Sequence, residues 1–192
     1  MDDLSKYILS FGPLITAVAT LVAAFYVQHR NNQKVLKQKQ REEERKEIFT
    51  KLKDFYGPLQ RLRGKSNELH KLFKNGREFR TLIKLLEGEK FSGNDKKLLD
   101  SIIDIGKQTD ELIIKEGGWV QDSELRKMLD KVTAHYTLID LAAKDELTGD
   151  VKRFEQFVFP NEIDDEIEKE IVRLNSRLNE LDEEILEEYK TW

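Results

Sequence analysis

The longest apolar stretch of the chain lies near its start, in residues 7–28, which contain no Asp, Glu, Lys, Arg or His. As a helix, these 22 residues reach roughly 33 Å, enough to cross the ~30 Å hydrocarbon core of a bilayer. Thr16 and Thr20 interrupt the run, but their hydroxyls can bond to the preceding helical turn at little cost. This pattern predicts a single N-terminal transmembrane helix.

Two other interpretations of the apolar stretch are a secretory signal peptide and a core helix of a soluble domain. A signal peptide begins with a basic region, whereas this chain begins with MDDLSK, which has two acids against one Lys. A core helix carries a polar stripe, and this stretch has no charged one. The flanking charge then sets the orientation, since cytoplasmic flanks are basic. We expect a single-pass protein of the cell inner membrane, with the N-terminus outside and the C-terminal domain cytoplasmic. Five basic residues follow the stretch and are expected to contact lipid headgroups: Arg30, Lys34, Lys37, Lys39 and Arg41.

In the rest of the chain the apolar positions recur every three or four residues, which is typical of helices. The fold class is therefore all-α: a single N-terminal transmembrane helix continues into a charged stalk and a cytoplasmic helical bundle with a long C-terminal helix. The predicted parts are a transmembrane anchor (1–28), a charged helical stalk (29–56) and the bundle (57–192). Gly57-Pro58 predicts a break between stalk and bundle.

Several shorter signals predict where the helices of the bundle begin and end. Asn75-Gly76 and Gly117-Gly118 are helix stops, Ser92 or Asn94 can cap one helix, and Asp122 or Ser123 can cap the next.

The last helix carries a heptad-like row of apolar side chains after Pro160. We call this row the C-terminal seam: Ile163, Ile167, Ile171, Leu174, Leu178, Leu181 and Ile185. It either packs along its own bundle or mediates self-association. The carboxylates beside it, such as Asp164-Asp165-Glu166, are interpreted as a solvated face.

Charge is segregated along the chain. Residues 7–90 hold 18 Lys and Arg against 9 Asp and Glu, and residues 91–192 hold 14 against 26. A basic membrane-proximal half suits a domain held near an anionic leaflet. The acidic distal half argues against nucleic acid lying across the whole domain, and leaves a local site on the basic half open.

Few residues suggest chemistry. There is no Cys, no phosphate-binding Gly loop and no His-Glu-x-x-His, so we expect no cofactor and no metal. Arg63 and His70 are seven residues apart, so they share one helical face. This pair resembles the Arg-x4–6-His motif of HEPN domains, helical bundles that often cleave RNA as dimers. The resemblance implies catalytic roles for both residues: Arg63 stabilises phosphate charge and His70 transfers a proton.

The order of the parts also resembles small bacterial single-span proteins with a HEPN-like domain, the accessory proteins of type VI-B CRISPR systems. That resemblance implies oligomeric assembly into a membrane pore during phage defence. A row of small residues could form the membrane and oligomer face: Gly12, Thr16, Thr20, Ala23 and Ala24.

We therefore expect a membrane-anchored oligomeric protein that acts on the membrane, as a pore or membrane-perturbing effector, in anti-phage defence. The alternatives are a passive membrane-tethered adaptor that binds a partner through the C-terminal seam and, third, a HEPN-type RNase. The expected partners are the lipid bilayer, further copies of the chain and a protein of a defence system, with nucleic acid left open.

Overall fold

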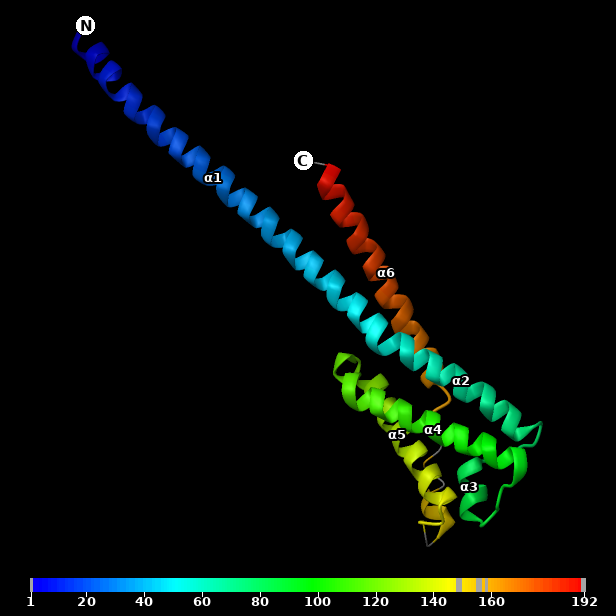
Figure 1. The fold of residues 1–192 in the computed structure, drawn as a ribbon. Coiled ribbons are helices and arrows are strands. Elements are labelled where there is room, and N and C mark those ends of the chain that lie inside the picture. The colour runs from blue at the N-terminus through cyan, green and yellow to red at the C-terminus, as the bar shows by residue number, and fades with distance from the viewer. Residues whose placement is uncertain (1, 148–149, 155–156, 158, 191–192) are drawn as a thin grey trace. The chain divides into compact units, whose positions relative to one another are not determined.

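The computed structural model describes residues 2–147, 150–154, 157 and 159–190, and within these ranges it describes side chains from residue 16 to residue 187. Every regular element in these ranges is helical, in agreement with the predicted all-α class (Figure 1). In chain order the elements are α1 (Asp2–Thr50), the π-helix η1 (Lys51–Tyr56), α2 (Gly57–Lys74), α3 (Thr81–Leu86), α4 (Gly93–Glu116), the 3-10 helix η2 (Gly117–Trp119), α5 (Ser123–Ala143), the 3-10 helix η3 (Val151–Phe154) and α6 (Ile163–Lys190).

The chain divides into two compact units. One consists of Glu47–Glu180, which we call the core unit. The other consists of Met1–Lys46 with Leu181–Trp192. Within the latter, Arg41 pairs with Glu184 at 2.9 Å and Arg45 pairs with Asp182. Such partly exposed ion pairs stabilise a structure by about 1 kcal/mol or less. Their contribution to the stability of this unit is therefore small.

The predicted transmembrane helix is wrong for the part of the chain whose side chains are described. No helix there combines the length and the apolar character needed to cross a bilayer.

The predicted break at Gly57-Pro58 is also wrong, because the chain stays helical from α1 through η1 into α2. Proline removes a donor and crowds the carbonyl four residues before it, which ends or kinks an α-helix. Here the six-residue π-helix wraps more loosely, and the Gly57 N–H donates to the Leu52 carbonyl five residues back. A Cβ at position 57 would lie 2.9 Å from that carbonyl oxygen, so this geometry requires glycine.

The predicted helix ends in the core unit are largely confirmed. α2 ends at Asn75, which adopts the left-handed conformation, and α4 begins after Ser92 and ends at Gly117. The carboxylate of Asp122 accepts from the Leu125 N–H at 2.7 Å and caps α5. These signals are local, because each depends on one or two residues and their own backbone.

The core of this unit forms where α4 packs against both α2 and α5, while α3 packs on α5. Apolar side chains from all of these helices are buried, and α6 adds the first part of the C-terminal seam: Ile163 is 0%, Ile167 1% and Leu174 3% exposed. This part of the seam therefore packs within its own chain, which was one of the two predicted arrangements. Helices α4 and α5 pack closely at Gly106 on α4, where a Cβ would lie 2.5–2.9 Å from three carbon atoms of Tyr136 on α5.

This contact predicts a strong effect of Gly106→Ala. The added methyl group must push Tyr136 or its helix away, and such overpacking costs about 1–3 kcal/mol of unfolding free energy. Gly64→Ala is the matched control, because it also lies in a helix and has no atom within 4 Å of the new Cβ. It should stabilise the chain by about 0.5–1 kcal/mol through helix propensity alone. Urea denaturation of both variants measures the difference, and equal effects would contradict the close packing at Gly106.

Candidate functional site

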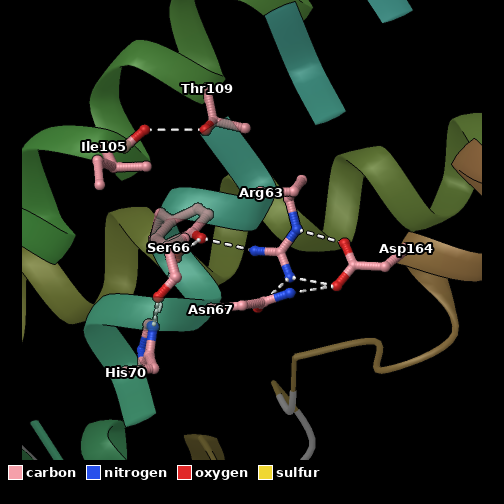
Figure 2. A network of polar contacts seen from close by, with 8 residues as sticks. Arg63, Ser66, Asn67, His70, Ile105, Thr109 and Asp164 are labelled. Atoms are coloured by element: carbon pink, nitrogen blue, oxygen red, sulfur yellow. Dashed lines mark hydrogen bonds and ion pairs between the residues drawn. The ribbon is translucent and has the colours of Figure 1, made fainter. Parts of the chain in front are cut away.

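A buried arginine on α2 forms the base of the candidate site. Arg63 is 5% exposed, and because a guanidinium keeps its charge, burial requires partners. Its Nε and Nη2 donate to the two carboxylate oxygens of Asp164, in the first turn of α6, at 2.8 and 3.1 Å (Figure 2). Nη1 donates to the Tyr136 hydroxyl at 2.8 Å, and Nη2 also donates to Asn67 Oδ1 at 3.1 Å. This bidentate pairing is the stronger form of ion pair, and it connects α2 with α6.

The carboxylate of Asp164 supplies the balancing negative charge. Burial on its own raises the pKa of this group, but hydrogen bonds from Arg63 and Asn67 outweigh burial and hold the pKa below its ordinary value. Asn67 contributes through its Nδ2, which donates to Oδ2 at 2.7 Å. The interpretation of Asp164 as part of a solvated face is therefore wrong, since this side chain is the main partner of a buried cation.

Tyr136 extends the network to α5. Its hydroxyl accepts from Arg63 and lies 2.8 Å from the hydroxyl of Ser66, which is 0% exposed. The ring of Phe159 covers the guanidinium, with 4.2 Å between its centroid and Arg63 Cζ. The face of an aromatic ring attracts a cation, so the ring of Phe159 covers the guanidinium and also interacts favourably with it.

Two histidines lie beside this network with the same bonding pattern. Nδ1 of His70 is 3.0 Å from the carbonyl oxygen of Ser66, and Nδ1 of His135 is 2.9 Å from that of Phe157. A carbonyl only accepts, so each Nδ1 carries the proton, and in the neutral ring Nε2 is left as an acceptor. Burial lowers the pKa of both imidazoles despite these hydrogen bonds, and the nearby charge of Arg63 lowers it further. Both rings are therefore neutral at neutral pH.

A pocket of about 560 Å³ adjoins these groups. Its basic lining residues are Lys71, Lys74 and Arg80, together with Arg63. Lys71 pairs with Glu68 at 2.6 Å. Lys74 and Arg80 have no ion-pair partner among the residues that the structure describes. The remaining lining residues are neutral: Asn67, His70, Phe79, Thr81, Leu82, Ile83, His135, Tyr136, Phe154, Phe157, Phe159 and Asn161.

The pocket contains both residues of the predicted Arg63–His70 pair. Their shared helical face is confirmed, whereas their catalytic roles stay a prediction. Sequence reasoning missed His135, Tyr136 and Phe159, which come from distant segments and reach the pocket only through folding. Their residue types alone do not predict that they line a common pocket, since single aromatic residues are common in helical cores.

The other predicted site residues lie on α1 and outside the pocket. Thr16, Thr20, Ala23 and Ala24 are exposed, and the Thr20 hydroxyl donates to the Thr16 carbonyl at 2.8 Å, as expected. Gly12 lies outside the residues whose side chains are described. Of the predicted headgroup contacts, Arg30, Lys34, Lys37 and Lys39 are exposed and Arg41 is half-buried beside Glu184. Their roles stay predictions.

The rest of the C-terminal seam is buried or half-buried along α6. Leu181 is 0% exposed, while Ile171, Leu178 and Ile185 are half-buried. Across the described ranges, no group of three or more metal-ligating side chains is brought together.

The buried histidines predict that acid weakens the fold. An unfolded histidine has a pKa of about 6.5, and the folded pKa values of His70 and His135 are lower. The unfolded state therefore binds more protons as the pH falls from about 7 to 5, and the unfolding free energy decreases. In a His70→Asn/His135→Asn variant, whose amides can still donate to the carbonyls, this slope should be smaller. Urea denaturation at several pH values measures it, with His29→Asn on α1 as control, and equal slopes would contradict the assignment.

Comparison with known proteins gives no family for the chain. No protein-family model, curated protein or solved structure matches it. The resemblance to HEPN-like membrane proteins therefore stays a prediction, and the functional inference depends on the contacts, burial and charge of the pocket.

Proposed function

We propose that the core unit is a binding module for a small anionic molecule, which it holds in the pocket beside Arg63. One observation carries this proposal. The chain has 37 Asp and Glu among 192 residues, yet none of the 16 described lining residues is acidic, while four are Lys or Arg. A pocket of one charge sign in an acidic protein concentrates ligands of the opposite sign.

The basic side chains of the pocket differ in whether they are already paired with a carboxylate. Arg63 is neutralised by the bidentate contact with Asp164, so it supports the wall rather than attracting a ligand. Lys74 and Arg80 lack such partners in the described chain, and their charge is available to an incoming anion. An anion that pairs with them gains charge-assisted hydrogen bonds without first displacing an internal carboxylate.

The size and the remaining lining of the pocket also suit a small ligand. Binding sites for small molecules are typically about 300–1,000 Å³ in volume and combine apolar walls with a few fixed polar groups. Here the apolar part comes from Phe79, Leu82 and Phe157, and the polar part from Asn67 and the histidines. The backbone hydrogen bonds of the histidines hold their rings in place before any ligand arrives, which reduces the entropic cost of binding.

The functions expected from the sequence are affected differently by these findings. Pore formation and membrane tethering depended on the transmembrane helix, and we do not propose them. RNA cleavage through Arg63 requires a guanidinium that can reach a phosphate, whereas this one donates to Asp164, Tyr136 and Asn67. RNase activity, self-association and a protein partner stay predictions.

The proposal predicts that anions stabilise the chain through Lys74 and Arg80. A ligand present at 100 times its Kd raises the unfolding free energy by about 2.7 kcal/mol. Thermal unfolding in a panel of phosphomonoesters, dicarboxylates, sulfonates and matched neutral molecules should show stabilisation by at least one anion. Lys74→Glu/Arg80→Glu should abolish the shift.

The matched control is Arg61→Glu/Lys65→Glu, which makes the same charge change at exposed positions of α2 outside the pocket. This variant should keep the full shift. Absence of stabilisation by every anion, or an equal loss in both variants, would contradict the proposed function.

A further inference from the structure

We infer that the anion is a nucleoside monophosphate, with its base near His70 and His135 and its phosphate at Lys74 and Arg80. This inference rests on the proposed function and names the ligand class of the same pocket. It follows from the hydrogen-bond acceptors, aromatic rings and unpaired cations that line this pocket together.

The pocket runs along one face of α2. Arg63, Asn67, His70 and Lys74 follow one another at spacings of three and four residues, and all of them line the pocket. Lys74 follows Arg63 by eleven positions, which corresponds to about 16 Å along the helix axis. The pocket is therefore elongated, with Arg63 near one end of this face, Lys74 near the other, and His70 one helical turn from Lys74.

Phe159, Tyr136 and His135 lie close to Arg63. The ring of Phe159 covers the guanidinium, and the ring of His135 is 5.5 Å from that of Phe159, measured between centroids. Phe157, whose carbonyl orients His135, lines the same pocket and is 38% exposed. An accessible ring beside fixed polar groups is the arrangement on which a planar heterocycle stacks.

The two histidines define which hydrogen bonds that heterocycle can make. Because each Nδ1–H donates to a backbone carbonyl, each ring has Nε2 left as an acceptor. They therefore complement a ligand with N–H donors on its ring, such as the exocyclic amines and ring N–H groups of nucleobases. A plain aromatic acid or a sugar phosphate lacks such donors on a flat ring.

The two unpaired cations of the pocket complement phosphate. Lys74 and Arg80 provide two positive charges that are not paired among the described residues. A phosphomonoester carries a charge of about −1.5 to −2 at pH 7 and offers three acceptor oxygens. Its charge matches that of the two cations, whereas a phosphodiester carries one negative charge only. A mononucleotide can thus donate to the histidine Nε2 atoms, stack on the ring of Phe157 and pair with the two cations.

Isothermal titration of the full chain with GMP, AMP, guanosine, ribose 5-phosphate and inorganic phosphate tests the inference. At least one nucleotide should bind about tenfold or more tightly than both ribose 5-phosphate and the free nucleoside. Ribose 5-phosphate lacks the contacts of the base, and the nucleoside lacks the contacts of the phosphate. Lys74→Ala/Arg80→Ala should bring the nucleotide and the nucleoside to equal affinity, while Arg61→Ala/Lys65→Ala should leave their difference intact. His135→Asn should weaken the nucleotide without changing ribose 5-phosphate.

The contradicting results separate the two levels of the proposal. If ribose 5-phosphate binds as tightly as the nucleotides, or if only a different class of anion from the thermal panel binds, the nucleotide assignment is overturned and anion binding stands. If no anion binds at all, the proposed function itself fails. These comparisons on the unmodified chain do not depend on the folding of any variant.

Discussion

The structure of the core unit depends on the requirement that the buried charge of Arg63 be fully paired. A guanidinium cannot lose its proton at ordinary pH, so the chain has to supply acceptors where the side chain is 6% exposed. Asp164, Tyr136 and Asn67 supply them, and they come from α6, α5 and α2. The same interaction thus fixes three helices relative to one another and builds one end of the pocket.

The chemistry of the pocket follows from which charges are balanced within the chain and which are not. The cation of Arg63 is balanced by Asp164 and covered by Phe159, and burial keeps His70 and His135 neutral. Lys74 and Arg80 line the same pocket and have no ion-pair partner among the described residues. A ligand with a neutral, flat end and an anionic end fits this difference, and this is the physical basis of both proposals.

Local features of this fold could be predicted from the sequence, and long-range ones could not. Asn75, Ser92 and Asp122 act within their own turn of helix, and their predicted positions as helix ends are confirmed. Gly57-Pro58 failed as a break because a π-helix, whose hydrogen bonds reach one residue further, accommodates the proline. Asp164 looked like any other solvated carboxylate, because its partner Arg63 is 101 residues away in the chain. The Arg63–His70 pair was found through its resemblance to a short sequence motif, whereas His135 becomes its neighbour only through tertiary packing.

A double-mutant cycle on Arg63 and Asp164 tests the central claim most directly. Arg63→Met and Asp164→Ala, alone and together, are compared with the unmodified chain by urea denaturation at neutral pH. Each single change should cost about 2–4 kcal/mol, and the double variant should be more stable than the sum of the two predicts by about 2 kcal/mol. The reason is that Asp164→Ala leaves the guanidinium of Arg63 buried without its carboxylate, and this cost is absent when Arg63 is also replaced. Additive effects within about 0.5 kcal/mol would show that the pair does not hold the helices together.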